Sequence, residues 1–149
     1  MAKGVIRCSV QYPNGTDFVN KYHLGKGGYV QQTIDSDVLK FLQKYTPRRS
    51  AQGTTLMTSA YSHTTIGSGE INYPGPYAHF QYVGYVRTTE DGRVFARKDE
   101  AKPILTKREL SHEKSKNPNA TKEWFETMKK NHTQDILESA KRAAKRGKP

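Results

Sequence analysis

Five histidines and one cysteine are the side chains of this chain with the widest capacity for metal binding and proton transfer. The histidines stand far apart in the sequence, and neither an HxxxH nor an HExxH spacing occurs among them. The single cysteine excludes an internal disulfide and a cysteine cage for zinc. We therefore predict no metal, no cofactor and no catalytic residue, and a hydrolase built around His79 or His132 is kept only as a third hypothesis.

Gly25, Gly27 and Gly28 stand just before a predicted helix, where a phosphate-binding loop would lie. A helix N-terminus offers free N–H groups to an anion. The run lacks the Lys-Ser/Thr pair of a P-loop and the full GxGxxG spacing. We predict that these glycines form a flexible entry to the helix.

Aromatic side chains are concentrated between residues 77 and 85, and arginines follow at 87 and 97. Such a set provides a platform on which single-stranded nucleic acid stacks. Tyr and Arg are also enriched where one protein subunit packs on another. No RNP-like motif is present, so the subunit interface is the preferred interpretation.

The elements that position these residues follow from hydrophobic spacing. Ile6, Cys8, Val10 and Tyr12 alternate with polar residues, as in a strand with one buried face. A helix over about 29–45 is predicted by apolar residues at steps of three and four, and Pro47 ends it. The apolar positions are Val30, Ile34, Val38, Phe41, Leu42 and Tyr45.

The sequence pattern in the middle of the chain, from about residue 54 to 95, predicts β-strands. Residues 54–73 predict two strands joined at Gly67-Ser68-Gly69, and residues 77–86 predict a third, aromatic strand. Asp91-Gly92, between 86–88 and 93–95, is a strong hairpin signal. The charged stretch 97–119 has little periodicity and predicts a long loop available for assembly.

A second amphipathic helix is predicted over about 121–146, with Thr121 as N-cap and Gly147 at its end. Its stripe is Phe125, Met128, His132, Ile136, Ala140 and Ala143, with Trp124 and Leu137 beside it. We therefore predict an α+β fold in which both helices pack on a small antiparallel sheet. The chain is expected to be a single domain, 1–149, with the 97–119 loop and a polar tail at 147–149.

Composition indicates a basic protein with a modest core. The net charge is +11, and Leu, Ile, Val and Phe are only 26 of the 149 residues. This falls near the level at which disorder is suspected, but nine Tyr, five Phe and one Trp favour a folded core. The basic balance raises the chance of contact with nucleic acid or an acidic surface. A basic run closes the chain. We interpret it as a solvated helix end in preference to a nucleic-acid patch; it consists of Lys141, Arg142, Lys145, Arg146 and Lys148.

Two groups of short motifs resemble the minor capsid or tail-completion proteins of long-tailed bacteriophages. The first group consists of 45–47, 53–56, 66–70 and 77–84, in which Tyr77-Ala78-His79-Phe80-Gln81-Tyr82-Val83-Gly84 matches a family segment PYAxxxYxG. The second consists of Asn117-Pro118 and a late helix with Trp124-Phe125-Glu126-Thr127-Met128-Lys129, His132 and Ile136. The likeness spans about two thirds of the chain, from Leu39 to Ala143.

The resemblance implies a subunit of a ring, hexameric, in the phage neck. The ring would be a homo-oligomer with portal or adaptor proteins on its head side and tail terminator or tail tube proteins on its tail side. The protein would be made in the host bacterial cytoplasm, would have no contact with a membrane, and would reside in the virion, touching phage DNA without reading its sequence. The residues expected at subunit interfaces are Tyr77, Phe80, Tyr82, Tyr85, Trp124 and Phe125. Those expected to face DNA in the channel are Arg87, Arg93, Arg97 and Lys98.

The alternative hypothesis, from a different class, is a small nucleic-acid-binding domain. It would use the segment 77–97 and the C-terminal lysines and arginines. Its affinity would fall steeply between low and moderate salt.

Overall fold

The structure is a computed structural model that describes residues 4–8, 16–48, 56–74, 76–94, 97, 99–102, 104–112 and 114–147, without the side chains of 16–18, 76 and 77. Its elements in chain order are β1 (Gly4–Arg7), α1 (Thr16–Lys21), α2 (Tyr29–Leu42), α3 (Leu56–His63), β2 (Glu70–Tyr73), α4 (Pro76–Val83), β3 (Tyr85–Thr88), β4 (Ile104–Glu109) and α5 (Trp124–Arg146). Helices and antiparallel strands together confirm the predicted α+β class. The strands form two separate two-stranded sheets, β1–β2 and β3–β4, where the sequence predicted one.

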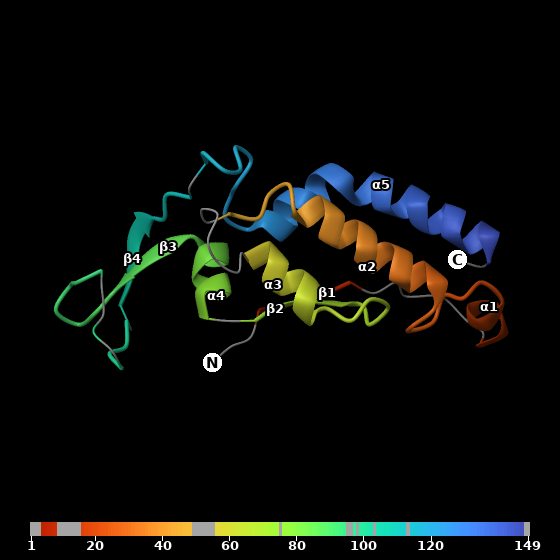
Figure 1. Cartoon of the computed structure of the whole chain (residues 1–149), viewed down its shortest axis with the longest axis horizontal. Helices are drawn as coiled ribbons and strands as arrows, with labels where there is room; N and C mark the ends of the chain where they lie inside the picture. The colour runs from red at the N-terminus through yellow and green to blue at the C-terminus, as the bar shows by residue number, and fades with distance from the viewer. Residues whose placement is uncertain are drawn as a thin grey trace.

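The two predicted amphipathic helices form the body of the molecule. α2 and α5 lie side by side and run in opposite directions along the long axis (Figure 1). Glu123 is the N-cap of α5, in a left-handed conformation (φ 47°) and without a side-chain cap hydrogen bond, so the predicted Thr121 cap is wrong. Gly147 ends α5 in a left-handed conformation, as predicted.

The core lies between α2, α5, α3 and β2, and it contains the predicted helix stripes. Val30, Ile34, Val38 and Leu42 of α2 are buried against it. From α5, Trp124, Met128 and Ala143 are buried, and the other predicted stripe residues are partly buried. Trp124 is the largest fully buried side chain, with its ring 4.9 Å from that of Tyr82 in an edge-on contact.

A buried carboxylate fixes the β1–β2 sheet to α2. Asp35 accepts hydrogen bonds from the backbone N–H groups of Gly67 (2.7 Å) and Gly69 (3.1 Å). The side-chain amide of Gln31 donates a third, at 2.7 Å. These three donors satisfy a charge that would otherwise be costly to bury, and they hold the turn that leads into β2.

The glycine run before α2 has a structural role. Gly28 is the N-cap of α2, and a Cβ on it would lie 2.2 Å from the carbonyl oxygen of His23. Gly27, at φ 78°, donates its N–H to the Gly67 carbonyl at 2.8 Å. Close backbone approach explains Gly28, and the left-handed φ explains Gly27; both stand at the entry to the helix, where the sequence placed them.

Two of the predicted strands are wrong. Residues 56–63, expected as a strand, form α3, whose Met57 and Ala60 are buried in the core. Residues 76–83, expected as most of an aromatic strand, form α4, and only 85–88 of that segment is a strand. Of the two strands predicted over 54–73, the second is present as β2. The strand predicted near the N-terminus is β1, and Ile6 and Cys8 show the predicted alternation of burial. Val10 and Tyr12 lie outside the described residues.

The predicted turn at Asp91-Gly92 is present, but the strand after it is not the expected one. Gly92 donates its N–H to the Thr89 carbonyl, and Thr89 donates to that of Arg93. β3 then pairs with β4, at residues 104–109, instead of 93–95. The segment 97–119, expected to be a loop throughout, therefore contains a strand. Among the described residues, no helix is long and apolar enough to cross a membrane.

Candidate assembly surface

The hairpin formed by β3 and β4, here called the arm, stands at one end of the long axis, away from the α2–α5 body (Figure 1). β4 has no buried residue along its length. Ile104 is 48% exposed and Leu105 is 53% exposed, although both are large apolar side chains. Neighbouring side chains of a strand point to opposite faces, so the arm carries apolar surface on both of its faces.

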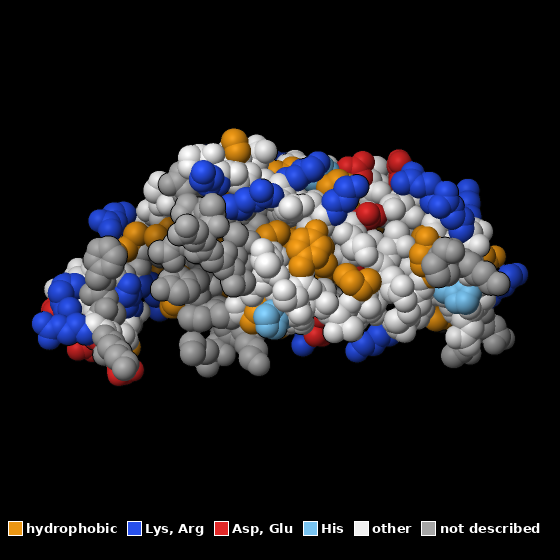
Figure 2. All heavy atoms as spheres, viewed as in Figure 1, with side chains coloured by type: hydrophobic (Ala, Val, Ile, Leu, Met, Phe, Trp, Pro, Cys, Tyr) orange, Lys and Arg blue, Asp and Glu red, His pale blue; other side chains and the backbone are white. Residues whose placement is uncertain are grey.

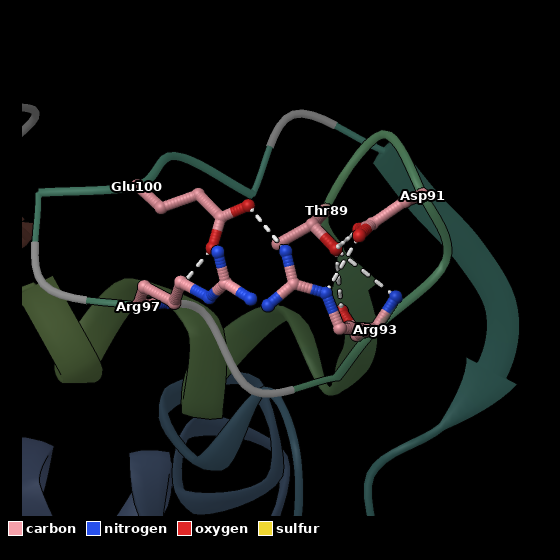
Figure 3. A network of polar contacts seen from close by, with 5 residues as sticks. All are labelled: Thr89, Asp91, Arg93, Arg97 and Glu100. Atoms are coloured by element: carbon pink, nitrogen blue, oxygen red, sulfur yellow. Dashed lines mark hydrogen bonds and ion pairs between the residues drawn. The ribbon is translucent and has the colours of Figure 1, made fainter.

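The tip of the arm is held by a polar network (Figure 3). The Arg93 guanidinium donates to Asp91 at 2.6 Å and to Glu100 at 2.7 Å. Glu100 also accepts the backbone N–H of Arg97 at 2.8 Å, and the Thr89 hydroxyl donates to Asp91. Hydrogen bonding to Arg93 and Thr89 holds the pKa of the Asp91 carboxyl below its usual value. Within the described residues, these polar contacts of the turn come from side chains of the arm.

The base of the arm is attached to the chain segment that precedes α5. Gly84, between α4 and β3, adopts φ 75°, and a Cβ there would lie 2.6 Å from the Lys122 side chain. Lys122 pairs with Glu109 of β4, and its ammonium lies 4.9 Å from the centre of the Tyr85 ring. Pairing with Glu109 raises the pKa of Lys122. A residue other than glycine at 84 would disturb both the backbone and this contact.

A second apolar surface is a groove of about 300 Å³ that runs along β1. All four residues of β1 line it, together with Tyr73, Ala78, His79, Tyr82, Trp124 and Phe125. Because side chains alternate across a strand, the four consecutive residues of β1 that line the groove belong to both faces of the strand. Val5 of β1, 41% exposed, faces outward in the middle of it.

The rim of the groove near Tyr82 is acidic. The backbone N–H of Glu123 donates to the Tyr82 carbonyl at 2.9 Å, which places the two residues together. Burial raises the pKa of the Tyr82 hydroxyl, and the charges of Glu126 and Glu123 raise it further. Tyr73, which also lines the groove, is buried, and its burial raises the pKa of its hydroxyl to about 12.

The six residues predicted at an interface are divided by the structure. Tyr82 and Phe125 line the groove and are partly exposed, whereas Trp124 lines it but is buried in the core. Phe80 is 36% exposed on α4, with the Arg87 guanidinium 5.3 Å from its ring centre, and Tyr85 lies at the base of the arm. The side chain of Tyr77 lies outside what the structure describes. Tyr82, Phe125, Phe80 and Tyr85 are therefore the accessible members of the set.

Of the four residues predicted to face DNA, two are free of ion pairs within the described part of the chain. Arg87 and Arg97 form none, whereas Arg93 is engaged by two carboxylates. Lys98 lies outside the described residues. Figure 2 shows Lys and Arg side chains gathered at both ends of this face, over the arm and over the end of α5. Lys141, Arg142, Lys145 and Arg146 supply the second group.

One cluster of polar side chains was not predicted from the sequence, because Tyr45 is far in the chain from His132 and Asp135. The Tyr45 hydroxyl lies 3.0 Å from His132 Nε2, and His132 Nδ1 lies 2.9 Å from the Asp135 carboxylate. The imidazole also stacks on Phe41, with ring centres 4.2 Å apart. This order of hydroxyl, imidazole and carboxylate occurs in hydrolases. The groove along β1 does not include it, and it joins the end of α2 to α5.

Three of the motif segments behind the resemblance, 45–47, 77–84 and 117–129, meet in the structure, whereas Gly67 and Gly69 of a fourth contact Asp35 of α2. The Asn117 side-chain amide donates to the Thr46 carbonyl at 2.9 Å, and the Thr121 N–H donates to that of Tyr45. Tyr82 packs on Trp124 in the same region. These residues, distant in sequence, form one packed junction at the start of α5.

Comparisons with known proteins give no relative. No protein-family model matches the chain, and neither a curated protein nor a solved structure matches it. Within the described residues, no three His, Cys, Asp or Glu side chains converge to hold a metal ion.

Proposed function

We propose that this chain is a structural subunit of a tailed-phage neck, one copy in a ring that joins the head to the tail, and not an enzyme. The observation that carries the proposal is the arm with its exposed Ile104 and Leu105. An isolated two-stranded sheet is at best marginally stable in water. Exposed apolar residues on such a sheet indicate that another molecule covers it. An arm of this kind serves assembly and has no evident use in a monomeric enzyme.

The neck assignment itself comes from the motif resemblance. Three of the motif segments, 45–47, 77–84 and 117–129, come together in the junction at the start of α5. In this proposal the partners are other copies of the chain, portal or adaptor proteins towards the head, and tail terminator or tail tube proteins towards the tail. The basic side chains at the end of α5 and on the arm would contact passing DNA without sequence readout.

A stop codon in the gene, in a phage that encodes this chain, tests the proposal. We expect filled heads and complete tails that remain unjoined in electron micrographs. Wild-type protein supplied from a plasmid should restore joined particles. Joined, infectious particles without the protein, or purified virions that lack it, would contradict the proposal.

A nucleic-acid-binding domain remains the second candidate, favoured by the four cations of residues 141–146, which form no ion pair within the described chain. Binding to a DNA duplex should then weaken steeply as salt rises from about 50 to 200 mM. Replacing Lys141, Arg142, Lys145 and Arg146 by Gln should reduce that salt dependence. Absence of binding at low salt removes this candidate.

A further inference from the structure

We propose that the groove along β1 receives the β4 strand of a second copy of this chain. The incoming strand would extend the β1–β2 sheet, with the Leu105 side chain in the groove and that of Ile104 on the opposite face of the extended sheet. This inference rests on the proposed function, because it specifies the contact between neighbouring subunits of the ring.

The edge of β1 is open to another strand. The N–H of Cys8 donates to the Gly69 carbonyl, and Gly4 and Ile6 stand opposite Tyr73 and Ile71 in the antiparallel register. Backbone groups alternate in direction along a strand, so those of Val5 and Arg7 point away from β2. Within the described part of the chain they have no hydrogen-bond partner. An unpaired edge of this kind is a template for an added strand.

The groove beside this edge is suited to apolar side chains. Its far wall is formed by Ala78, Tyr82, Trp124 and Phe125, and Val5 projects from β1 itself. Charged residues adjoin this apolar lining: Arg7 is paired to Glu70 at 3.2 Å, and Glu123 and Glu126 lie near Tyr82. A strand with apolar residues followed by cations would match both features.

β4 has that sequence. Ile104 and Leu105 are followed by Lys107 and Arg108, about 7–10 Å further along an extended strand. Glu126 is paired with Lys129, but exposed Glu123 has no ion pair within the described chain, so it is available to these cations. The other edge of β4 has no strand beside it among the described residues.

A second copy is the occupant because the arm cannot reach its own groove. The arm lies at one end of the molecule and points away from β1 (Figure 1), so the free edge of β4 lies far from the groove of its own chain. The donating and receiving surfaces are thus different parts of the chain. Such heterologous contacts generate rings when the rotation between subunits closes.

The inference is tested by mixing two variants that each lose one side of the contact. Val5→Asp alters the groove, Leu105→Asp alters the arm, and Leu137→Asp on α5 is the control, since Leu137 is 44% exposed and lies outside both surfaces. Sedimentation velocity measures association, and circular dichroism verifies folding. His79→Arg, which leaves β1 unchanged and adds a cation to the groove, is the second groove variant.

We expect wild type and Leu137→Asp to associate equally in a concentration-dependent manner. Each groove or arm variant alone should associate at least about tenfold more weakly. An equal mixture of Val5→Asp and Leu105→Asp contains one intact groove and one intact arm, so it should form dimers and nothing larger.

Three results would overturn the inference. They are a wild type that is monomeric at millimolar concentration, folded groove variants that associate as well as wild type, and a mixture without dimers. Loss of association in Leu105→Asp alone would assign the arm to a different surface. None of these results decides whether particles lacking the protein have unjoined heads and tails, so the proposed function is tested separately.

Discussion

The body and the arm of this molecule use their apolar residues in opposite ways. In the body, α2 and α5 direct Leu42 and Trp124 into a core that excludes water. In the arm, β4 leaves Ile104 and Leu105 about half exposed. The same residue type therefore contributes to folding in one region and is available for a partner in the other. The difference teaches that a chain poor in aliphatic residues can keep a small, complete core and leave its remaining apolar surface for assembly.

The largest expected effect comes from a matched pair of leucines. Leu42→Ala, at a fully buried position, should lower the free energy of unfolding by about 2–5 kcal/mol because it leaves a cavity. Leu105→Ala, on the arm, should change it by less than about 0.5 kcal/mol in the monomer. Urea unfolding followed by circular dichroism measures both. Equal losses in the two variants would abolish the distinction between body and arm.

Removal of the buried carboxylate should have the next largest effect. Asp35→Ala leaves the N–H groups of Gly67 and Gly69 and the amide of Gln31 without their acceptor, and should cost about 2–4 kcal/mol. Asp37→Ala is the control, since Asp37 lies on the same helix and forms no ion pair within the described chain. The same urea titration compares the two, and a loss below about 1 kcal/mol for Asp35→Ala would contradict the structure.

Stability at alkaline pH depends on the partly buried thiol of Cys8, which directly follows β1. Burial raises the pKa of the Cys8 thiol from 9.0 to about 11, so the folded state keeps this proton after the unfolded state has lost it. The free energy of unfolding should therefore fall as the pH rises from about 9 to 11, by about 1–2 kcal/mol. Urea unfolding of Cys8→Ala over the same range should show a shallower decline. Identical slopes for the two proteins would show that Cys8 is not buried in this way.

The smallest global effect is expected in the arm. Thr89 is 1% exposed, and its hydroxyl accepts the N–H of Arg93 at 3.0 Å. Thr89→Val should release the turn and speed amide exchange in β3 and β4 about fivefold, which corresponds to about 1 kcal/mol. Exchange in α2 should stay unchanged. A matching acceleration in α2 would mean that arm and body unfold as one unit.

The helices of the body were predictable because their apolar residues recur with helical spacing. The bounds 29–42 and 124–146 fall within the ranges expected from the sequence. α3 was not predicted, since Thr, Ser and Tyr have weak helix propensity and the burial of Met57 and Ala60 decides its conformation. α4 was mistaken for a strand because of its aromatic residues, although Pro76 at its first position was an available helix signal.

The arm and the groove were harder to predict. β4 is exposed on both faces, so its sequence has no alternation to reveal a strand. The groove brings β1 together with the start of α5, which is more than a hundred residues away in the chain. The sequence predicted Tyr82 and Phe125 as interface residues, but it could not show that they line one groove with Val5. Contacts of this kind depend on tertiary packing, which no local pattern encodes.

Hydrogen exchange in the free and the associated protein tests most directly the claim that the arm is built for assembly. The account predicts rapid exchange of β3 and β4 amides in dilute monomer, strong protection of the same amides on association, and little change in α2 and α5. Arm amides that are as protected as those of α2 in the monomer, or that remain unprotected after association, would contradict it.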